Sequence, residues 1–144
     1  MPAKPVPDGY RTVTPYLTVR GVARLLEFVQ KAFDATVTFQ MPGPGGAVAH
    51  AEFKVGDSMV MAGEPRGESV PRPGMIYLYV PDADATYRKA LDAGAEVVMP
   101  MTNQFYGDRS GGVTDPCGNQ WWIATHVEDV SMEEMKRRAA AHGK

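Results

Sequence analysis

Residues 75–94 read Met75-Ile-Tyr-Leu-Tyr-Val-Pro-Asp-Ala-Asp-Ala-Thr-Tyr-Arg-Lys-Ala-Leu-Asp-Ala-Gly94, a short apolar strand followed by a helix. Asp82 is a favourable helix N-cap, and Gly94 suits the left-handed position that often follows a helix. Further strand-type runs continue from this helix to residue 126, with a last strand at 120–126. The stretch therefore predicts a β-α-β-β-β unit.

The first half of the chain has the same order. A strand-type run at 11–19 precedes a helix at 22–33, and strands follow at 37–41, 48–55 and 58–62. Val19 and Val80 close equivalent strands at an offset of 61 residues, and the strands at 37–41 and 97–101 are offset by 60. A shared order with a near-constant offset indicates a duplicated supersecondary unit.

We therefore expect an α+β fold in which two βαβββ modules form a curved mixed β-sheet around a cleft, with helices on the outer face. The modules should span about 11–64 and 75–126, within a single domain of residues 1–130. Residues 63–74 are rich in Pro and Gly and form the expected linker, and a glycine-containing loop is expected at 102–112. A capping box at Ser131–Glu134 opens a C-terminal helical tail at 131–144.

The composition excludes several classes of protein. The chain has 144 residues, 44% hydrophobic and 22% charged, with a net charge of −2, which is typical of a globular domain and gives no basic footprint for nucleic acid or an anionic membrane. A lone cysteine, Cys117, allows no intrachain disulfide and favours a cytoplasmic location. No apolar run reaches the roughly 20 residues that span a bilayer, and the first residues resemble no signal peptide.

Strand alternation predicts which side chains line the cleft. Because successive side chains point to opposite faces of a sheet, Ile76 and Leu78 should pack on the helices, as should Val13 and Leu17. The opposite face should carry aromatic and methionine side chains, with His50 and Glu52 as polar groups. This composition suits a flat or hydrophobic small molecule. The expected substrate-binding residues on this face are Tyr16, Met59, Met61, Tyr77, Tyr79 and Trp122.

Each candidate has a structural alternative. His50 and Glu52, about 6.6 Å apart on one strand face, are either an acid–base pair or solvated residues of a half-exposed sheet. The tyrosines and Trp122 are either a ligand cage or a second core or dimer interface. Asp108 and Arg109 lie on the expected loop, where Arg109 is either a substrate-binding anion clamp or part of an internal salt bridge. His126 is interpreted as a surface residue, and Cys117 has no nearby base and is not a candidate nucleophile.

The sequence resembles the vicinal oxygen chelate superfamily, which contains glyoxalase I, bleomycin and fosfomycin resistance proteins and extradiol dioxygenases. The resemblance covers about residues 11–130 and rests on the two βαβββ units, the helix ending Leu91-Asp-Ala-Gly-Ala-Glu96, and the segment Asp115-Pro-Cys-Gly-Asn-Gln-Trp-Trp-Ile123. Tyr106-Gly-Asp-Arg109 and the Trp-Ile-Ala-Thr-His ending are similar to the PhnB-like branch. The resemblance implies a homodimer.

Metal-dependent members of that superfamily hold a divalent cation with four His or Glu ligands on the concave sheet face. Alignment of the two halves puts Thr14, Met61, Met75 and Trp122 at those positions. Such side chains are unsuited to a hard cation, which prefers carboxylate or imidazole. We therefore expect neither a metal nor another cofactor.

Two functions remain open from the sequence, beside a structural role without a ligand. The first is a metal-independent protein that binds a small apolar or planar molecule in an aromatic cleft, as in glyoxalase-like or bleomycin-resistance-like proteins. The second is an isomerase- or lyase-type enzyme that uses His50 and Glu52 as an acid–base pair, with a non-standard metal as an option. In both cases the partner is a small-molecule ligand.

Overall fold

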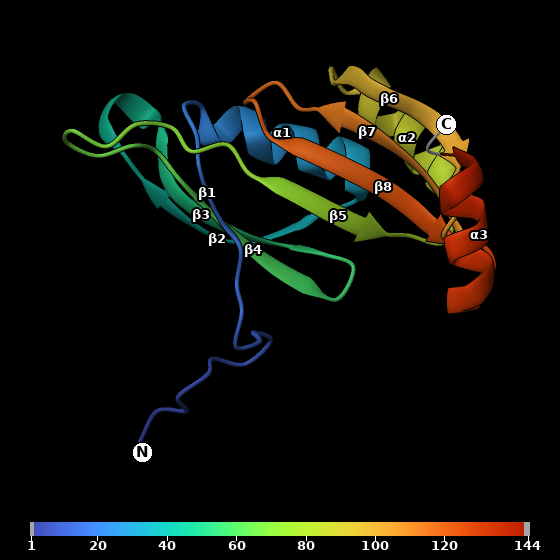
Figure 1. Ribbon diagram of the computed structural model, residues 1–144. Coiled ribbons are helices and arrows are strands. Elements are labelled where there is room, and N and C mark those ends of the chain that lie inside the picture. Colours follow the sequence, from blue (N-terminus) through green and yellow to red (C-terminus); the bar gives the residue numbers. More distant parts are fainter. Residues whose placement is uncertain (1, 143–144) are drawn as a thin grey trace.

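The structure, a computed structural model, describes residues 2–142 (Figure 1). The first module comprises β1 (Tyr16–Thr18), α1 (Val22–Phe33), β2 (Thr36–Pro42), a 3-10 turn (Pro44–Gly46), β3 (Val48–Val55) and β4 (Ser58–Gly63). The second comprises β5 (Met75–Tyr79), α2 (Ala83–Asp92), β6 (Glu96–Asn103), β7 (Asp108–Thr114) and β8 (Gln120–His126), and α3 (Met132–His142) follows. Residues 143–144 of the expected helical tail lie outside the described residues.

The two modules have the same sheet topology. The strand orders are β1-β4-β3-β2 and β5-β8-β7-β6, and in each sheet the first strand runs parallel to the last strand of its module. The other neighbours are antiparallel. The predicted α+β fold of two βαβββ modules is therefore confirmed, with the strands divided between two separate four-stranded sheets.

Strand register makes the duplication exact at the level of single residues. Tyr16 of β1 lies opposite Met61 of β4, and Tyr77 of β5 lies opposite Trp122 of β8. Met61 and Trp122 therefore occupy equivalent places, as the alignment of the two halves predicted.

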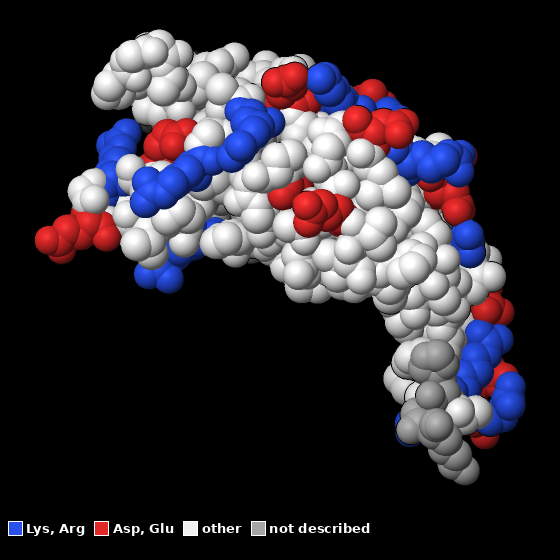
Figure 2. Space-filling model, turned by 90° about the horizontal axis from the view of Figure 1, so that it is seen from above, with Lys and Arg blue, Asp and Glu red and all other residues white. Residues whose placement is uncertain are grey.

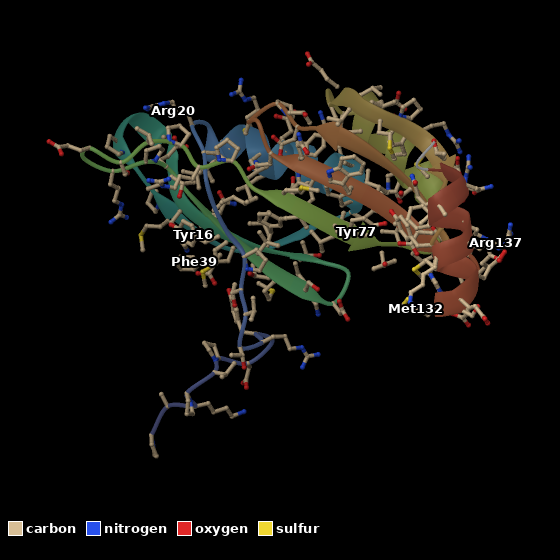
Figure 3. The ribbon with its side chains drawn as sticks, viewed as in Figure 1. Tyr16, Arg20, Phe39, Tyr77, Met132 and Arg137 are labelled. Carbon is tan, nitrogen blue, oxygen red and sulfur yellow. The ribbon has the colours of Figure 1, made fainter. Side chains whose placement is uncertain are left out.

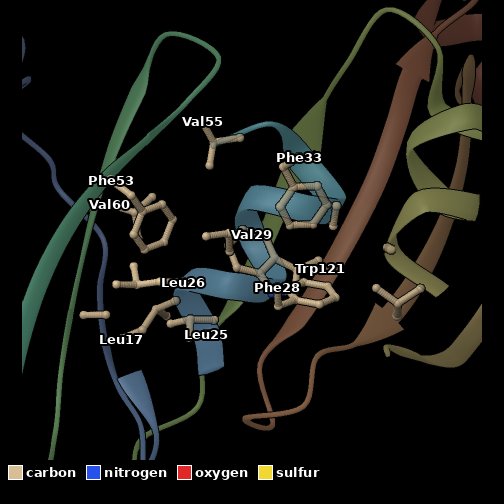
Figure 4. Close-up of a cluster of buried hydrophobic side chains, with 14 of the residues drawn as sticks. Leu17, Leu25, Leu26, Phe28, Val29, Phe33, Phe53, Val55, Val60 and Trp121 are labelled. Carbon is tan, nitrogen blue, oxygen red and sulfur yellow. The ribbon is translucent and has the colours of Figure 1, made fainter. Parts of the chain in front are cut away.

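The hydrophobic core is built around α1, which lies between the two sheets (Figure 4). On one side Leu26 and Val29 lie near Phe53 and Val60 of the first sheet. On the other side Phe33 meets Trp121 of β8, with ring centroids 4.8 Å apart. Buried side chains of both modules thus form one continuous cluster.

The start of α1 is fixed by a carboxylate from another element. Gly21 has φ 91°, a left-handed conformation that favours glycine, and it offers no side chain to cap the helix. Glu64, just after β4, accepts hydrogen bonds from the backbone N–H groups of Gly21 and Val22 at 2.6–3.0 Å. The negative charge satisfies the unpaired donors and favours the positive end of the helix dipole.

The first strand is shorter than predicted. The ladder begins near Pro15, whose carbonyl accepts the N–H of Met61, and residues 11–14 lie outside the sheet. Proline lacks an N–H donor, so pairing cannot continue through it. The prediction that Val13 packs on the helices is wrong, because its side chain is 82% exposed.

The expected loop at 102–112 is also largely strand. β6 and β7 pair from Glu96↔Thr114 to Asn103↔Arg109, so that residues 104–107 alone connect them. Two glycines that suggested a loop instead lie in closely packed strand positions. A Cβ on Gly111 would lie 2.9 Å from the Tyr87 ring, and one on Gly112 would lie 3.1 Å from the Trp122 ring.

Candidate functional site

The concave face of the first module carries a chain of hydrogen bonds that joins three of the predicted site residues. His50 Nε2 lies 3.0 Å from Glu52 Oε2, and His50 Nδ1 lies 3.2 Å from the Tyr16 hydroxyl. Because a carboxylate only accepts hydrogen bonds, the proton of neutral His50 lies on Nε2. Nδ1 is then the acceptor of the Tyr16 hydroxyl.

Tyr10 completes this chain by donating its hydroxyl proton to Glu52. It comes from the segment before β1, in which no strand or helix pattern could have signalled the contact. Phe39 of β2 flanks the imidazole of His50, with ring centroids 6.1 Å apart. Figure 3 labels Phe39 and Tyr16, which reach His50 from the two edge strands of the first sheet. Tyr10, Phe39, Glu52 and the predicted Met59 line a pocket of about 400 Å³.

The second module carries a different polar network on its concave face, centred on the buried Asp108. Tyr77 and Tyr79 donate to the same Asp108 oxygen, Oδ2, at 2.8 and 2.9 Å. His126 Nδ1 lies 2.9 Å from Oδ1, and its Nε2 lies 2.8 Å from Asp129. His126 is exposed, as predicted, and is also a member of this network.

These contacts set the ionisation of the network. Burial by itself would raise the pKa of Asp108, but hydrogen bonds from His126, Tyr77 and Tyr79 outweigh it and leave the pKa below its ordinary value. Hydrogen bonds to Asp108 and Asp129 raise the pKa of His126. Burial and nearby hydroxyl and carboxylate groups raise the pKa of Tyr77. The tyrosines thus remain neutral donors to a stable carboxylate.

Arg109 does not lie where the sequence placed it. Alternation along β7 puts it on the helix side, where its Nε and Nη2 donate to the two oxygens of Asp84 in α2 at 2.8 and 2.9 Å. The expected loop position is therefore wrong, and Arg109 forms the internal salt bridge that was the alternative to an anion clamp. Arg109 was misplaced because the sequence of β7 predicts a loop. In a loop, side chains do not alternate between two faces, so no face could be assigned to Arg109.

A second pocket opens where the modules meet. It has a volume of about 440 Å³ and is lined from one side by Tyr77, Leu78 and Tyr79 of β5, and from the other by Phe33 and the β3–β4 hairpin. Asp34 at the end of α1 pairs with Lys89 of α2 at 2.8 Å across it. The predicted ligand-binding tyrosines thus border a cavity of ligand size.

The four positions that the resemblance assigned to metal ligands carry side chains unsuited to a hard cation. Met61 and Trp122 are equivalent by register, Met75 precedes Tyr77 on the same face, and Thr14 precedes β1. A thioether pair, an indole and a hydroxyl offer no carboxylate or imidazole to a hard cation. Among residues 2–142, no group of three or more His, Cys, Asp or Glu side chains is arranged to hold a metal ion.

Surface charge is mixed. Figure 2 shows positive and negative side chains alternating along the outer rim, while uncharged residues cover most of the remaining face. No helix within residues 2–142 has the length and hydrophobicity needed to cross a membrane.

The molecule belongs to the class of α+β proteins that are built from two βαβββ modules, each with an open concave face. The family model of the Glyoxalase/Bleomycin resistance protein/Dioxygenase superfamily matches residues 11–123, and the chain belongs to this family. Uncharacterized proteins of Mycobacterium bovis and Mycobacterium tuberculosis are 35% identical over 142 residues; the match covers 91% of this chain and 93% and 84%, respectively, of those proteins.

Solved structures share the fold. TioX from Micromonospora sp. ML1 superposes with a TM-score of 0.70 at 21% identity, covering 81% of this chain and 99% of that one. A gene product of Arabidopsis thaliana gives 0.61 at 26% identity, covering 77% and 93%. A PhnB protein from Bacillus cereus gives 0.61 at 17% identity, covering 80% and 99%.

Proposed function

We propose that this protein binds a small molecule with an apolar or planar body on its concave faces, without the divalent metal used by many members of its family. The observation that carries the proposal is the composition of these faces. Tyr16, Tyr77 and Tyr79 are 53%, 38% and 65% exposed there, while the positions of the usual ligands hold side chains unsuited to a metal. Large exposed aromatic surfaces in a concave site commonly mark ligand binding.

The adjacent tryptophans provide a test of this proposal. Trp122 lies on the concave face, whereas Trp121 is fully buried in the core. In a titration with phenazine, a planar uncharged probe, we expect the indole N–H resonance of Trp122 to shift saturably in a ¹H–¹⁵N spectrum, because a stacked ring alters its shielding. Trp121→Phe and Trp122→Phe assign the two resonances.

If only the Trp121 resonance shifted, or if neither resonance shifted, binding on the concave face would be contradicted. Elemental analysis of the purified protein is the second arm of this test. A stoichiometric divalent metal bound through the concave face would refute the metal-independent mode.

We also propose that the site is completed by a second copy of the chain. Within one chain the modules meet through α1, α2 and Trp121, and the concave aromatic residues stay exposed. Light scattering should then give twice the 15.7 kDa of one chain.

If each site combines a first module with a partner's second module, Tyr16→Ala mixed equally with Trp122→Ala should recover about a quarter of the sites after exchange. Recovery of none would oppose this pairing.

The distance between His50 and Glu52 favours a second candidate function, an isomerase- or lyase-type activity. Glu52 orients the imidazole through Nε2, so that Nδ1 could take the α-proton of an α-hydroxy ketone and return it to the former carbonyl carbon of the enediol. Tyr16 could turn its hydroxyl from Nδ1 to the substrate, give its proton to the carbonyl oxygen and regain one from the original hydroxyl. Such an isomerisation balances without a co-reactant.

Replacing His50 or Glu52 by alanine should, on this hypothesis, abolish proton exchange while ligand affinity remains. The measurement is deuterium uptake from solvent into a panel of aromatic α-hydroxy ketones, followed by mass spectrometry. General acid–base catalysis contributes about 10²–10⁴-fold in rate, so the loss should be of that order. Lys31→Ala, an exposed change on α1 that borders neither pocket described above, is the control. Full exchange in both site variants would eliminate the enzymatic role.

A further inference from the structure

Tyr77 and Tyr79 form a notch on the concave face of the second module, which we call the tyrosine notch. Their ring centroids lie 5.3 Å apart with 55° between the ring planes, and both rings reach solvent. Aromatic ring faces carry partial negative charge. Two tilted, accessible faces at this separation can both approach one bound group.

The hydroxyl protons of the notch are already committed. Both tyrosines donate to Oδ2 of Asp108, so their oxygens present lone pairs to a ligand. Hydrogen bonding to a carboxylate also shifts electron density toward the phenol rings. The notch therefore offers acceptors and negative ring faces, a combination that disfavours an anion.

A buried negative charge lies directly behind the notch. Asp108 is 2% exposed. Its other oxygen, Oδ1, lies 2.9 Å from Nδ1 of His126, and Nε2 of His126 lies 2.8 Å from Asp129. Two carboxylates face at most one positive imidazole, so this network keeps a net negative charge whether or not His126 is protonated. Within the network Asp108 is buried and weakly screened, whereas Asp129 is fully exposed and acts through solvent.

One buried polar group beside the notch has no partner. The hydroxyl of Ser110, on the same face of β7 as Asp108, has no hydrogen-bond partner within residues 2–142. Ser110 lies beside the notch in the sheet, because it and Tyr79 both pair with Ala124 of β8. Buried hydroxyls are normally hydrogen-bonded, and an exception commonly marks a place for a ligand or water. This observation is independent of the charge network and points to the same place.

We propose that the tyrosine notch binds an organic cation, an alkyl- or arylammonium group whose apolar body extends into the pocket at the module junction. Phe33, Leu78 and Val80 supply the apolar wall of that pocket, and its lining carries two carboxylates, Asp34 and Asp57, against one ammonium group, Lys89. Cations over tyrosine faces within about 6 Å of the ring centroid are stabilised by the ring quadrupole. This inference rests on the proposed binding function, and it names the class of ligand that would bind on the concave face of the second module.

A charge-matched pair of probes tests this assignment. Choline and its uncharged carbon isostere 3,3-dimethylbutan-1-ol have nearly the same shape, so their affinities for the protein, from NMR titration, isolate the effect of the charge. We expect choline to bind at least about tenfold more tightly, which corresponds to roughly 1.4 kcal/mol. Equal affinities, or binding of neither probe, would overturn the cation assignment.

Variants locate the effect. Asp108→Asn, which removes the charge, and Tyr79→Leu, which removes one ring, should each reduce the choline preference by about fivefold or more and leave the alcohol unaffected. Asp92→Asn, on the exposed face of α2, changes net charge equally and should have no effect. Retention of the preference in Tyr79→Leu would refute the notch even if Asp108→Asn did not fold. The phenazine titration on Trp122 decides the general binding function separately.

Discussion

Replacement of Asp115 by alanine is expected to lower the free energy of unfolding by about 3–5 kcal/mol. Asp115 is 4% exposed and organises the turn between β7 and β8. It accepts the indole N–H of Trp121 at 2.7 Å, the side-chain amide of Asn119 at 2.9 Å, and the backbone N–H groups of Cys117 and Asn119 at 2.7 and 3.0 Å. Alanine would leave these largely buried donors without an acceptor.

Urea unfolding followed by far-UV circular dichroism measures this effect. A loss of this size is a large share of the 5–15 kcal/mol that stabilises a typical domain, so the variant could be too unstable to purify. Asp115→Asn retains one acceptor oxygen and should cost about 2 kcal/mol. Asp92→Ala, an exposed change on α2, should alter stability by less than about 0.5 kcal/mol. A cost below 1 kcal/mol for Asp115→Ala would disprove the role of this carboxylate as the hub of the turn.

The two adjacent tryptophans of β8 should respond in opposite ways to truncation. Trp121→Ala should cost about 3–5 kcal/mol, because the fully buried ring contacts Phe33 and its removal leaves a cavity between the modules. Trp122→Ala removes a half-buried ring that lies over Gly112 on the concave face. It should cost about 1 kcal/mol but abolish binding of the planar probe.

Chemical unfolding and the phenazine titration together check this prediction, each applied to both variants. Trp121→Phe serves as the milder core change if Trp121→Ala does not fold, and it should keep probe binding. Similar losses of stability in the two alanine variants would contradict the opposite placement of the rings. Probe binding that survives in Trp122→Ala would contradict the concave site.

The concave faces combine one arrangement with two chemistries. Register places Tyr16 and Tyr77 in equivalent positions, yet the polar groups around them differ. In the first module the imidazole of His50 pairs with the partly buried carboxylate of Glu52. In the second module two phenols donate to the buried carboxylate of Asp108. A cleft completed by two chains would thus offer a proton-transfer group on one wall and a cation-attracting group on the other.

The local pattern of hydrophobic and polar residues was sufficient to predict much of the fold. The bounds of α1, β3 and β8 agree with the predicted helix and strands, because hydrophobic periodicity along a continuous element is itself a sequence property. The same alternation placed His50 beside Glu52 and Tyr77 beside Tyr79 correctly. It also paired Met61 with Trp122, since a repeated unit carries its own alignment.

The contacts that give the site its chemistry were decided by tertiary structure. Asp108 meets Tyr77, Tyr79 and His126 because β7, β8 and β5 align in register, and Arg109 turns to the helix side for the same reason. The glycines at 111 and 112, which in sequence indicate a loop, are strand residues packed closely against Tyr87 and Trp122, so that a Cβ at either position would force a neighbour to shift. The sequence by itself determined the modules and their repeated faces, since these depend on periodicity within each element. Only the packing of distant strands determined which polar groups meet, since register across a sheet depends on side chains far apart in the chain.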